Sequence, residues 1–536
     1  MNFVVRERGL ALPRSGQYGL ALCFPGPYRF GMAHLGFQSL VRLLAETPGW
    51  WGDRFFADTG LRSVVLRLPL HHFHIVAFSL SFELDVFSFL AMLREGGIPL
   101  YAAKRKEEHP FVLLGGPVVM LNPEIVAPFA DALAIGEAEV ILPQFLQVWS
   151  VLRSQGASRR EMWQTLARLP GVYVPECVIP RYKDGVLQAF SAEISLPIQR
   201  RWADINTFET RTFVYTPLSY FRSTALVELN RGCRYRCRFC AGCVIYAPLR
   251  HRSFELVLRM IAHMLSWNPE KIGLVGSDVL GYPGVEEVLH SIIRLGKKVT
   301  LSSLAGRDLA RREELLGLLR QGGLETITLA PETGDEALRC FFGKGLSNDE
   351  WVDLVQGCLK MGFSKVKLYF MLGKPDRAAF EADIAFLHRL VERTQSPGRL
   401  FVSYSFLIPK PHTPFEDLRA MSLEEWKREK EIFEKELRRL KVPFSGESPR
   451  SAWVELILAR GDRLLAFYLP EILETGKFLS LPVWRSVLAR LSRDADEWPR
   501  LPWREGQKPW QVVCLAAPRE CSEEHRTRSE NHCCFL

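Results

Sequence analysis

Three cysteines stand close together in residues 228–240, directly after an apolar run. Cys233, Cys237 and Cys240 are separated by three and then two residues. Zinc sites normally use four cysteine or histidine ligands, and no second such pair follows nearby. A 4Fe–4S cluster held by three thiolates keeps one iron open for a substrate or cofactor. The arginines between these cysteines would offset the negative charge and lower the thiol pKa values.

Other cysteines give weaker signals. Cys243 would be either a fourth ligand or a small buried apolar residue, and the second interpretation is favoured. A further group gathers at the C-terminus, and its spacing matches no standard zinc site. Its members are Cys521, His525, His532, Cys533 and Cys534.

The cysteine motif must be positioned by the elements around it, which alternate between strand-like and helix-like patterns over residues 223–420. Strands are predicted at 225–229, 272–275, 299–302, 326–329, 366–371 and 401–406. Helices are predicted at 254–265, 285–293, 313–320, 348–361 and 377–394. Six such units predict a partial (β/α)6 barrel of the TIM type, with its working face at the C-terminal ends of the strands.

The rest of the chain divides into three segments. Residues 1–150 repeat strand–helix units and predict a Rossmann-like parallel sheet, with strands at 18–24, 75–80, 111–114 and 131–135. Residues 151–222 form a β-containing linker with a hairpin turn at 182–185. Residues 421–536 predict a mainly helical C-terminal extension that opens with a capping box at Ser422 and Glu425 and ends in a loosely ordered tail from residue 497. The fold class is therefore α/β.

The spacing of the three cysteines, with aromatic Phe239 before the last one, resembles the signature of the radical S-adenosylmethionine (SAM) enzymes. The resemblance spans about residues 223–415. It implies a 4Fe–4S cluster on Cys233, Cys237 and Cys240, with SAM bound to the fourth iron. Reductive cleavage of SAM then gives a 5′-deoxyadenosyl radical that abstracts hydrogen from a substrate, and this chemistry belongs to the cofactors.

The same resemblance assigns residues that contact SAM. They follow successive predicted strands: Gly276, Ser277 and Asp278 after the second, Ser302 and Ser303 after the third, and Glu332 after the fourth. Phe239 completes the set. Asp278 stands where the family more often has Glu. Glu332 would accept hydrogen bonds from the ribose hydroxyls. The turn at 371–375 resembles the adenine-side turn of the family, and residues 409–415, which include His412, resemble a motif of the subgroup with a cobalamin-binding-like domain.

The N-terminal segment resembles the cobalamin-binding-like domains that precede such barrels. The resemblance rests on residues 115–117, 122–124 and 136–139. Some cobalamin domains supply a histidine ligand to cobalt, and the nearest candidate here is His34, whose surroundings lack the usual Asp and Gly. Either cobalamin binds without a histidine ligand, or the domain keeps the shape without the cofactor. Methyl transfer is the expected reaction if cobalamin binds, and a rearrangement or oxidation that starts with hydrogen abstraction is expected otherwise.

Composition sets the remaining limits. The 536 residues carry 69 basic and 60 acidic side chains, a net charge of +9, which permits an anionic or nucleic-acid partner without requiring one. No apolar run is long enough to span a membrane, and no secretory signal is evident, so a cytoplasmic protein is expected. We expect a radical SAM enzyme with an unidentified substrate and an electron donor such as flavodoxin or ferredoxin. The alternatives are a zinc or iron–sulfur protein that binds RNA and an iron–sulfur electron carrier.

Overall fold

The structure is a computed structural model that describes residues 6–302, 304–374, 376–504 and 506–516. It is a mixed α/β fold built on parallel sheets. The chain divides into two compact units, and the boundary between them falls at residues 223 and 224. Among the described residues, unit 1 contains 6–223, 457–498 and 503–516, whereas unit 2 contains 224–456 and 499–502.

Unit 1 is built on a six-stranded sheet with the order β3-β2-β4-β5-β6-β7. Its strands are β3 (Trp50–Phe56), β2 (Tyr18–Phe24), β4 (Ile75–Ser79), β5 (Phe111–Gly115), β6 (Ala132–Ala134) and β7 (Val172–Tyr173). All pairs are parallel except β6 with β7. Every residue of β2 is buried, which is the mark of a strand covered on both faces.

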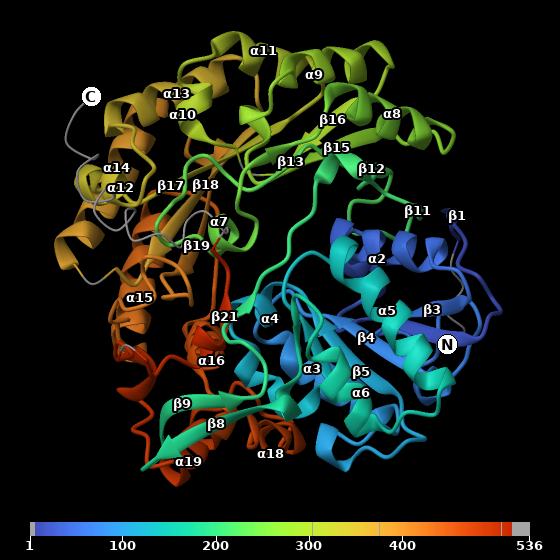
Figure 1. Ribbon diagram of the computed structural model, residues 1–536. Helices are drawn as coiled ribbons and strands as arrows, with labels where there is room; N and C mark the ends of the chain where they lie inside the picture. The colour runs from blue at the N-terminus through green and yellow to red at the C-terminus, as the bar shows by residue number, and fades with distance from the viewer. Residues whose placement is uncertain (1–5, 303, 375, 505, 517–536) are drawn as a thin grey trace. The chain divides into compact units, whose positions relative to one another are not determined.

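Amphipathic helices cover this sheet (Figure 1). They are α2 (Leu35–Glu46), α3 (Asp85–Glu95), α5 (Ala138–Ser154) and α6 (Arg159–Leu166). Apolar residues of α2 and α5 join the strands in one core cluster. The predicted hairpin is confirmed as β8 (Val178–Lys183) and β9 (Val186–Ala192). Its turn residues Asp184 and Gly185 both have positive φ, as a type I′ turn requires.

The chain returns to unit 1 after residue 456. This return carries α17 (Arg463–Ala466), α18 (Leu469–Glu474), α19 (Leu481–Arg490) and β21 (Val513–Cys514). Asn122 donates hydrogen bonds to the carbonyl oxygens of Ala459 and Gly461 at 3.1 and 2.7 Å. Arg463 donates to both carboxylate oxygens of Glu124 at 2.8 and 2.9 Å. The return is therefore part of the N-terminal unit.

The expectation of a loosely ordered tail from residue 497 is wrong for residues 509–515. Strand β21 pairs in parallel with β10 (Ile198–Gln199), and Trp510 and Leu515 are buried. The pairing partner lies more than 300 residues earlier in the chain, so local composition gave no sign of it. The C-terminal Cys and His group lies outside the described residues.

Unit 2 holds two parallel sheets. One contains β12 (Thr224–Glu228), β15 (Lys271–Val275) and β16 (Lys298–Leu301). The other contains β17 (Thr326–Glu332), β18 (Lys365–Leu372), β19 (Leu400–Phe406) and β20 (Phe444–Gly446). A parallel bridge between Leu304 and Leu329 joins the end of the first sheet to β17.

The helices of unit 2 match the sequence periodicity closely. They are α8 (Phe254–Leu265), α9 (Val285–Arg294), α11 (Glu313–Gln321), α13 (Asn348–Lys360), α14 (Arg377–Thr394) and α15 (Leu423–Arg439). The capping box at Ser422 and Glu425 opens α15 as predicted, with Ser422 Oγ accepting from Glu425 N–H at 3.2 Å. All six predicted strands are present. In the three largest sheets of the two units, strands β3, β7 and β20 were not predicted.

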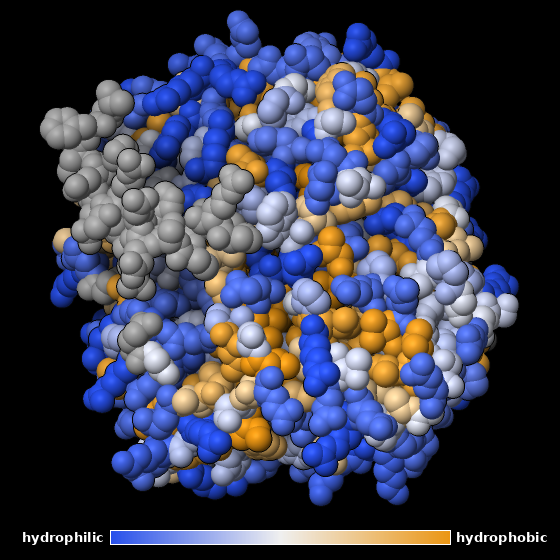
Figure 2. All heavy atoms as spheres, in the orientation of Figure 1, coloured by the Kyte–Doolittle hydropathy of each residue, from blue (hydrophilic) through white to orange (hydrophobic). Residues whose placement is uncertain are grey.

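Hydrophilic residues cover much of the face seen in Figure 2, as in globular proteins with an ordinary share of charged residues, here 24%. Within the described residues, no helix combines the length and the apolar character that crossing a bilayer requires.

We predict that Arg463→Met destabilises unit 1 by about 3 kcal/mol, because it leaves the Glu124 carboxylate buried without its cation. The Glu124 side chain is only 1% exposed, and Arg463 is 11% exposed. Urea unfolding measures the change. Arg485→Met is the matched control, since its ion pair with Asp496 is half exposed and should contribute less than about 0.5 kcal/mol. Equal effects of the two substitutions would contradict the prediction.

Candidate metal centre

The cysteine loop begins where β12 ends. A short strand, β13 (Asn230–Arg231), pairs with β14 (Arg250–His251), and the loop then turns through Gly232. Gly232 has a φ of +81°, and a Cβ there would lie 2.7 Å from the carbonyl oxygen of Pro248. Only glycine fits this position without strain. The three cysteines thus lie at the C-terminal edge of the first sheet, where ligands bind in α/β folds.

The thiols of this loop interact with one another. Cys243, the third residue of α7 (Ala241–Ile245), hydrogen-bonds to the sulfurs of both Cys233 and Cys240. These contacts lower the pKa of Cys233 to about 7 and that of Cys240 to about 6, and they raise the pKa of Cys243. Cys243 is partly exposed. The expectation that it is a buried apolar residue is therefore wrong.

Lys344 is a residue near the cysteines that sequence reasoning missed. It lies between Gly343 and Gly345, and its ammonium group lies 3.0 Å from Glu332 Oε1. Burial raises the pKa of Cys237 to about 11, and the positive charge of Lys344 opposes that rise. Glu332 ends β17 with a φ of +66°. A lone lysine in a Gly–Lys–Gly sequence gave no signal, because only the fold brings it to the cysteine loop.

Phe239 anchors the loop by apolar packing. Its ring meets that of Phe342 edge to face, with the centroids 5.5 Å apart. Phe342, Met371 and Phe415 form a buried cluster against which Phe239 packs. The N–H of Arg238 also donates to the carbonyl oxygen of Phe342 at 3.2 Å. Phe239 thus connects the cysteine loop to the end of β18 and to segments that follow β17 and β19.

The turn after β15 is bound tightly to the start of the cysteine loop. A Cβ on Gly276 would lie 2.5 Å from Asn230 Oδ1, so this glycine is required for close packing. Asn230 Nδ2 donates to the carbonyl oxygen of Asp278 at 2.6 Å, and Asp278 N–H donates to Asn230 Oδ1 at 3.2 Å. Ser277 and Ser302 are exposed at the same edge. Ser303 lies outside the described residues.

A buried ion pair lies behind the turns that follow β17 and β18. Lys374 pairs with Asp383 and donates to the carbonyl oxygen of Met371 at 2.6 Å. Asp383 also accepts from the Thr333 hydroxyl at 2.8 Å and from Gly334 N–H at 2.6 Å. This network fixes the two residues that directly follow Glu332. Neither Asp383 nor Thr333 was identified from the sequence.

The donor set suits an iron–sulfur cluster, in which each of three cysteine thiolates binds a different iron. Three partly exposed thiols, two of them with lowered pKa values and one beside a lysine, are suited to thiolate ligation.

His34, the residue considered as a cobalt ligand, is the N-cap of α2. Its Nδ1 accepts a hydrogen bond from Phe37 N–H at 3.2 Å. Since a backbone N–H can only donate, the neutral ring must carry its proton on Nε2. Neither nitrogen then offers a free lone pair to a metal.

Two protein-family models match the chain. The model described as "Radical SAM proteins, N-terminal" matches residues 36–175. The model of the radical SAM superfamily matches residues 227–387. The second match contains the three cysteines and every residue expected to contact SAM, and the two together cover more than half of the chain.

The relatives are distant. An uncharacterised protein of Methanocaldococcus jannaschii is 26% identical over 460 residues, which are 84% of this chain and 90% of that protein. An uncharacterised methyltransferase of Pyrococcus horikoshii is 25% identical over 303 residues, 54% of this chain and 60% of that one. Among solved structures, the radical SAM methyltransferase TsrM of Kitasatospora setae has a TM-score of 0.49 at 13% identity, covering 75% of this chain and 74% of its own.

We predict that Lys344→Met raises the pKa of Cys240 in the cluster-free protein. Lys344 favours the thiolate, so without it the thiol should keep its proton to a higher pH. The midpoint of the pH profile for carboxymethylation of Cys240, followed by mass spectrometry, should rise by about half a pH unit. Lys360→Met, at an exposed position on α13, is the control. An unchanged midpoint in Lys344→Met would show that the lysine does not influence the thiols.

Proposed function

Because this chain belongs to the radical SAM superfamily, we propose that it is an enzyme that cleaves SAM reductively to start a radical reaction on a substrate not yet identified. Cys233, Cys237 and Cys240 would each ligate one iron of a 4Fe–4S cluster. The observation that carries the proposal is the presence of three cysteines with this spacing at the C-terminal edge of a parallel sheet, within the matched superfamily segment.

The cluster with SAM supplies one-electron cleavage of the C5′–S bond, which gives methionine and a 5′-deoxyadenosyl radical that takes a hydrogen atom from the substrate. The protein holds the reactants in place. Phe239 fixes the loop by packing, and Lys344 offsets the negative charge of thiolates. We propose that Gly276, Ser277 and Ser302 line the SAM site and that Glu332 accepts hydrogen bonds from the ribose hydroxyls, with Lys344 orienting its carboxylate.

We further propose that the two units are a Rossmann-like domain and a partial barrel. The strand order of unit 1, parallel from β3 to β6, supports the first assignment. The two parallel sheets of unit 2 support the second, since the bridge between Leu304 and Leu329 continues from one sheet to the next.

Methyl transfer is the reaction class that we propose for the substrate. The relative from Pyrococcus horikoshii is named a methyltransferase, and it matches over half of this chain. Cobalamin is the cofactor that relays a methyl group in such chemistry, and unit 1 is the domain that we expect to bind it. The hydrogen bond from Phe37 to His34 favours binding without a histidine ligand.

The electron must come from another protein. We propose a low-potential carrier such as flavodoxin or ferredoxin, and a cytoplasmic enzyme, since thiols stay reduced in that compartment. The RNA-binding alternative relied on the arginines around the cysteines. Arg231 and Arg252 both pair with Glu228, and Arg234 pairs with Asp278 and Asp308. These three cations are neutralised within the protein, which favours the enzyme.

The proposal is tested with protein reconstituted anaerobically with iron and sulfide. Dithionite and SAM are added, and 5′-deoxyadenosine and S-adenosylhomocysteine are measured with and without hydroxocobalamin. We expect 5′-deoxyadenosine from the wild type and at least 100-fold less from Cys237→Ala, because a lost ligand removes the cluster. Cobalamin-dependent S-adenosylhomocysteine would support methyl transfer.

Two further results decide against the proposal. A fully loaded cluster that gives neither product, and whose EPR spectrum does not change when SAM is added, would exclude a radical SAM enzyme. Loss of the cluster in Cys243→Ala would identify Cys243 as a fourth ligand and favour an electron carrier. The matched control is Cys358→Ala, which removes a cysteine that is buried in α13.

A further inference from the structure

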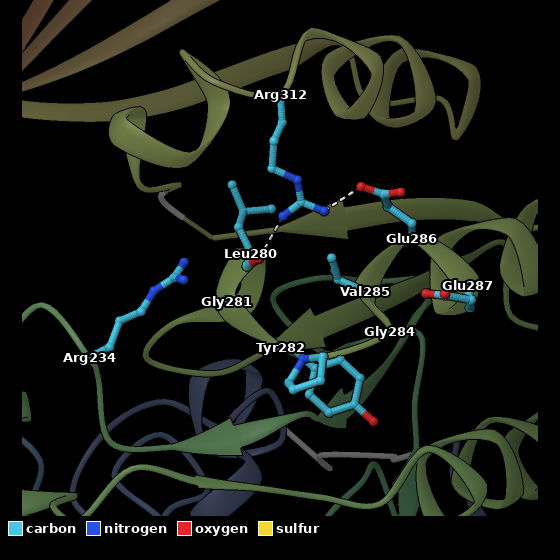
Figure 3. Close-up of a pocket in the computed structure, with 10 residues that line it drawn as sticks. Arg234, Leu280, Gly281, Tyr282, Gly284, Val285, Glu286, Glu287 and Arg312 are labelled. Atoms are coloured by element: carbon cyan, nitrogen blue, oxygen red, sulfur yellow. Dashed lines mark hydrogen bonds and ion pairs between the residues drawn. The ribbon is translucent and has the colours of Figure 1, made fainter.

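Arg234, the residue directly after the first cysteine, is held by two carboxylates from two different segments. Its Nε lies 2.9 Å from Asp278 Oδ2, in the turn after β15. Its Nη2 donates to both oxygens of Asp308 at 2.7 Å, in the short helix α10 (Gly306–Leu309) that follows β16. The Tyr235 hydroxyl also donates to Asp308, at 2.7 Å. Figure 3 shows Arg234 at the wall of a cavity of about 340 Å³.

Arg234 is joined to Cys233 by one peptide bond. Because its side chain is held by two carboxylates, the backbone next to Cys233 is restricted in its movement. On the other side of Cys233, the close approach of Gly232 to Pro248 fixes the backbone. Cys233 is therefore held from both sides.

The Asp278 carboxylate is buried, and both of its oxygens lie close to positively polarised groups of the protein. Its Oδ1 accepts from Gly281 N–H at 3.1 Å, where Asp278 is the N-cap of a short 3₁₀ helix. Its Oδ2 faces Arg234. The side chain is 1% exposed, whereas Glu332 is 13% exposed. The ammonium group of SAM would have to displace Arg234 to reach this carboxylate.

The other two cysteines are held differently. Phe239 packs on the buried aromatic cluster, and Arg238 N–H donates to Phe342. Neither contact involves Asp278 or Asp308. The contact of Arg234 with its two carboxylates therefore acts on Cys233 and not on the other two cysteines.

We propose that Asp278 and Asp308 are positioning residues that hold Cys233 in place through Arg234, and that Asp278 does not bind SAM. The proposal rests on the proposed function for its SAM measurements. It departs from the resemblance, which placed Asp278 among the SAM contacts.

The test compares Asp278→Asn, Asp308→Asn and Arg234→Gln with the wild type after anaerobic reconstitution. Iron content and the EPR spectrum of the reduced cluster without SAM report the ligand geometry. Turnover and the KM for SAM report binding and chemistry. We expect all three variants to share a changed SAM-free EPR spectrum and about tenfold lower turnover, as when groups that orient metal ligands are removed. The KM for SAM should stay within about twofold.

A double variant adds a second criterion. If the residues act as one unit, Asp278→Asn combined with Arg234→Gln should lose no more activity than the worse single variant. Glu286→Gln is the matched control. Glu286 pairs with Arg312 on the wall of the same cavity (Figure 3). Its substitution should leave the EPR spectrum, the turnover and the KM for SAM unchanged.

Several results would overturn the proposal. One is an Asp278→Asn protein with the wild-type EPR spectrum and a KM for SAM raised tenfold or more, which would make Asp278 a SAM ligand. Another is a wild-type spectrum in Asp308→Asn, which serves as the test if Asp278→Asn does not fold. If the wild type binds a cluster but yields no 5′-deoxyadenosine, the proposed function fails, while the EPR comparison without SAM still decides the positioning role.

Discussion

A loop that carries three thiols at the end of a strand has no hydrogen-bond ladder of its own, so its shape must come from the residues around it. Here the constraint is met by contacts from several later loops. Arg234 joins the cysteine loop to the turn after β15 and to the short helix α10 that follows β16. At the other end of the loop, Arg238 N–H is held by the carbonyl oxygen of Phe342, and Phe239 packs on the buried cluster that contains Phe342. The order of the strands therefore determines the geometry of the loop.

Charge is the second part of that constraint. Thiolates that are partly buried need cations close by, and a buried cation needs its own partner. Lys344 meets the first need and Glu332 meets the second. The position of the Glu332 carboxylate depends on the backbone around it. Asp383, which pairs with Lys374, holds this backbone by accepting a hydrogen bond from Gly334 N–H. The polar groups of this edge thus form a connected set.

The sequence revealed those features that depend on neighbouring residues. Helical periodicity gave α8 and α14 with their observed bounds, and the serine–glutamate spacing gave the start of α15. Strand β3 was missed because its pattern includes Asp53 and Arg54, which look exposed. Both are buried: Asp53 accepts from two backbone N–H groups at 2.6 and 2.8 Å, and Arg54 pairs with Glu7 at 2.8 Å.

The difference between local patterns and tertiary contacts also explains which residues of the site could be predicted. The cysteines and Phe239 were found because they fall within eight residues. Asp308, Lys344 and Asp383 lie far away in sequence, and nothing about their neighbours distinguishes them. Asp278 was found, but its role depends on Arg234, which approaches it only in the folded chain. Spacing therefore identified the ligands, whereas their positioning depends on tertiary contacts.

The path of the chain adds a constraint on folding. Unit 2 is inserted between two parts of unit 1, so unit 1 is complete only when residues 457–498 and 503–516 have been made. Until then Glu124 and Asn122 lack the partners that Arg463 and Gly461 provide. A buried carboxylate without a cation is costly, so the N-terminal segment cannot reach its final packing during early synthesis. The unit that begins first is therefore stabilised last, after the segment that carries the metal centre has been made in full.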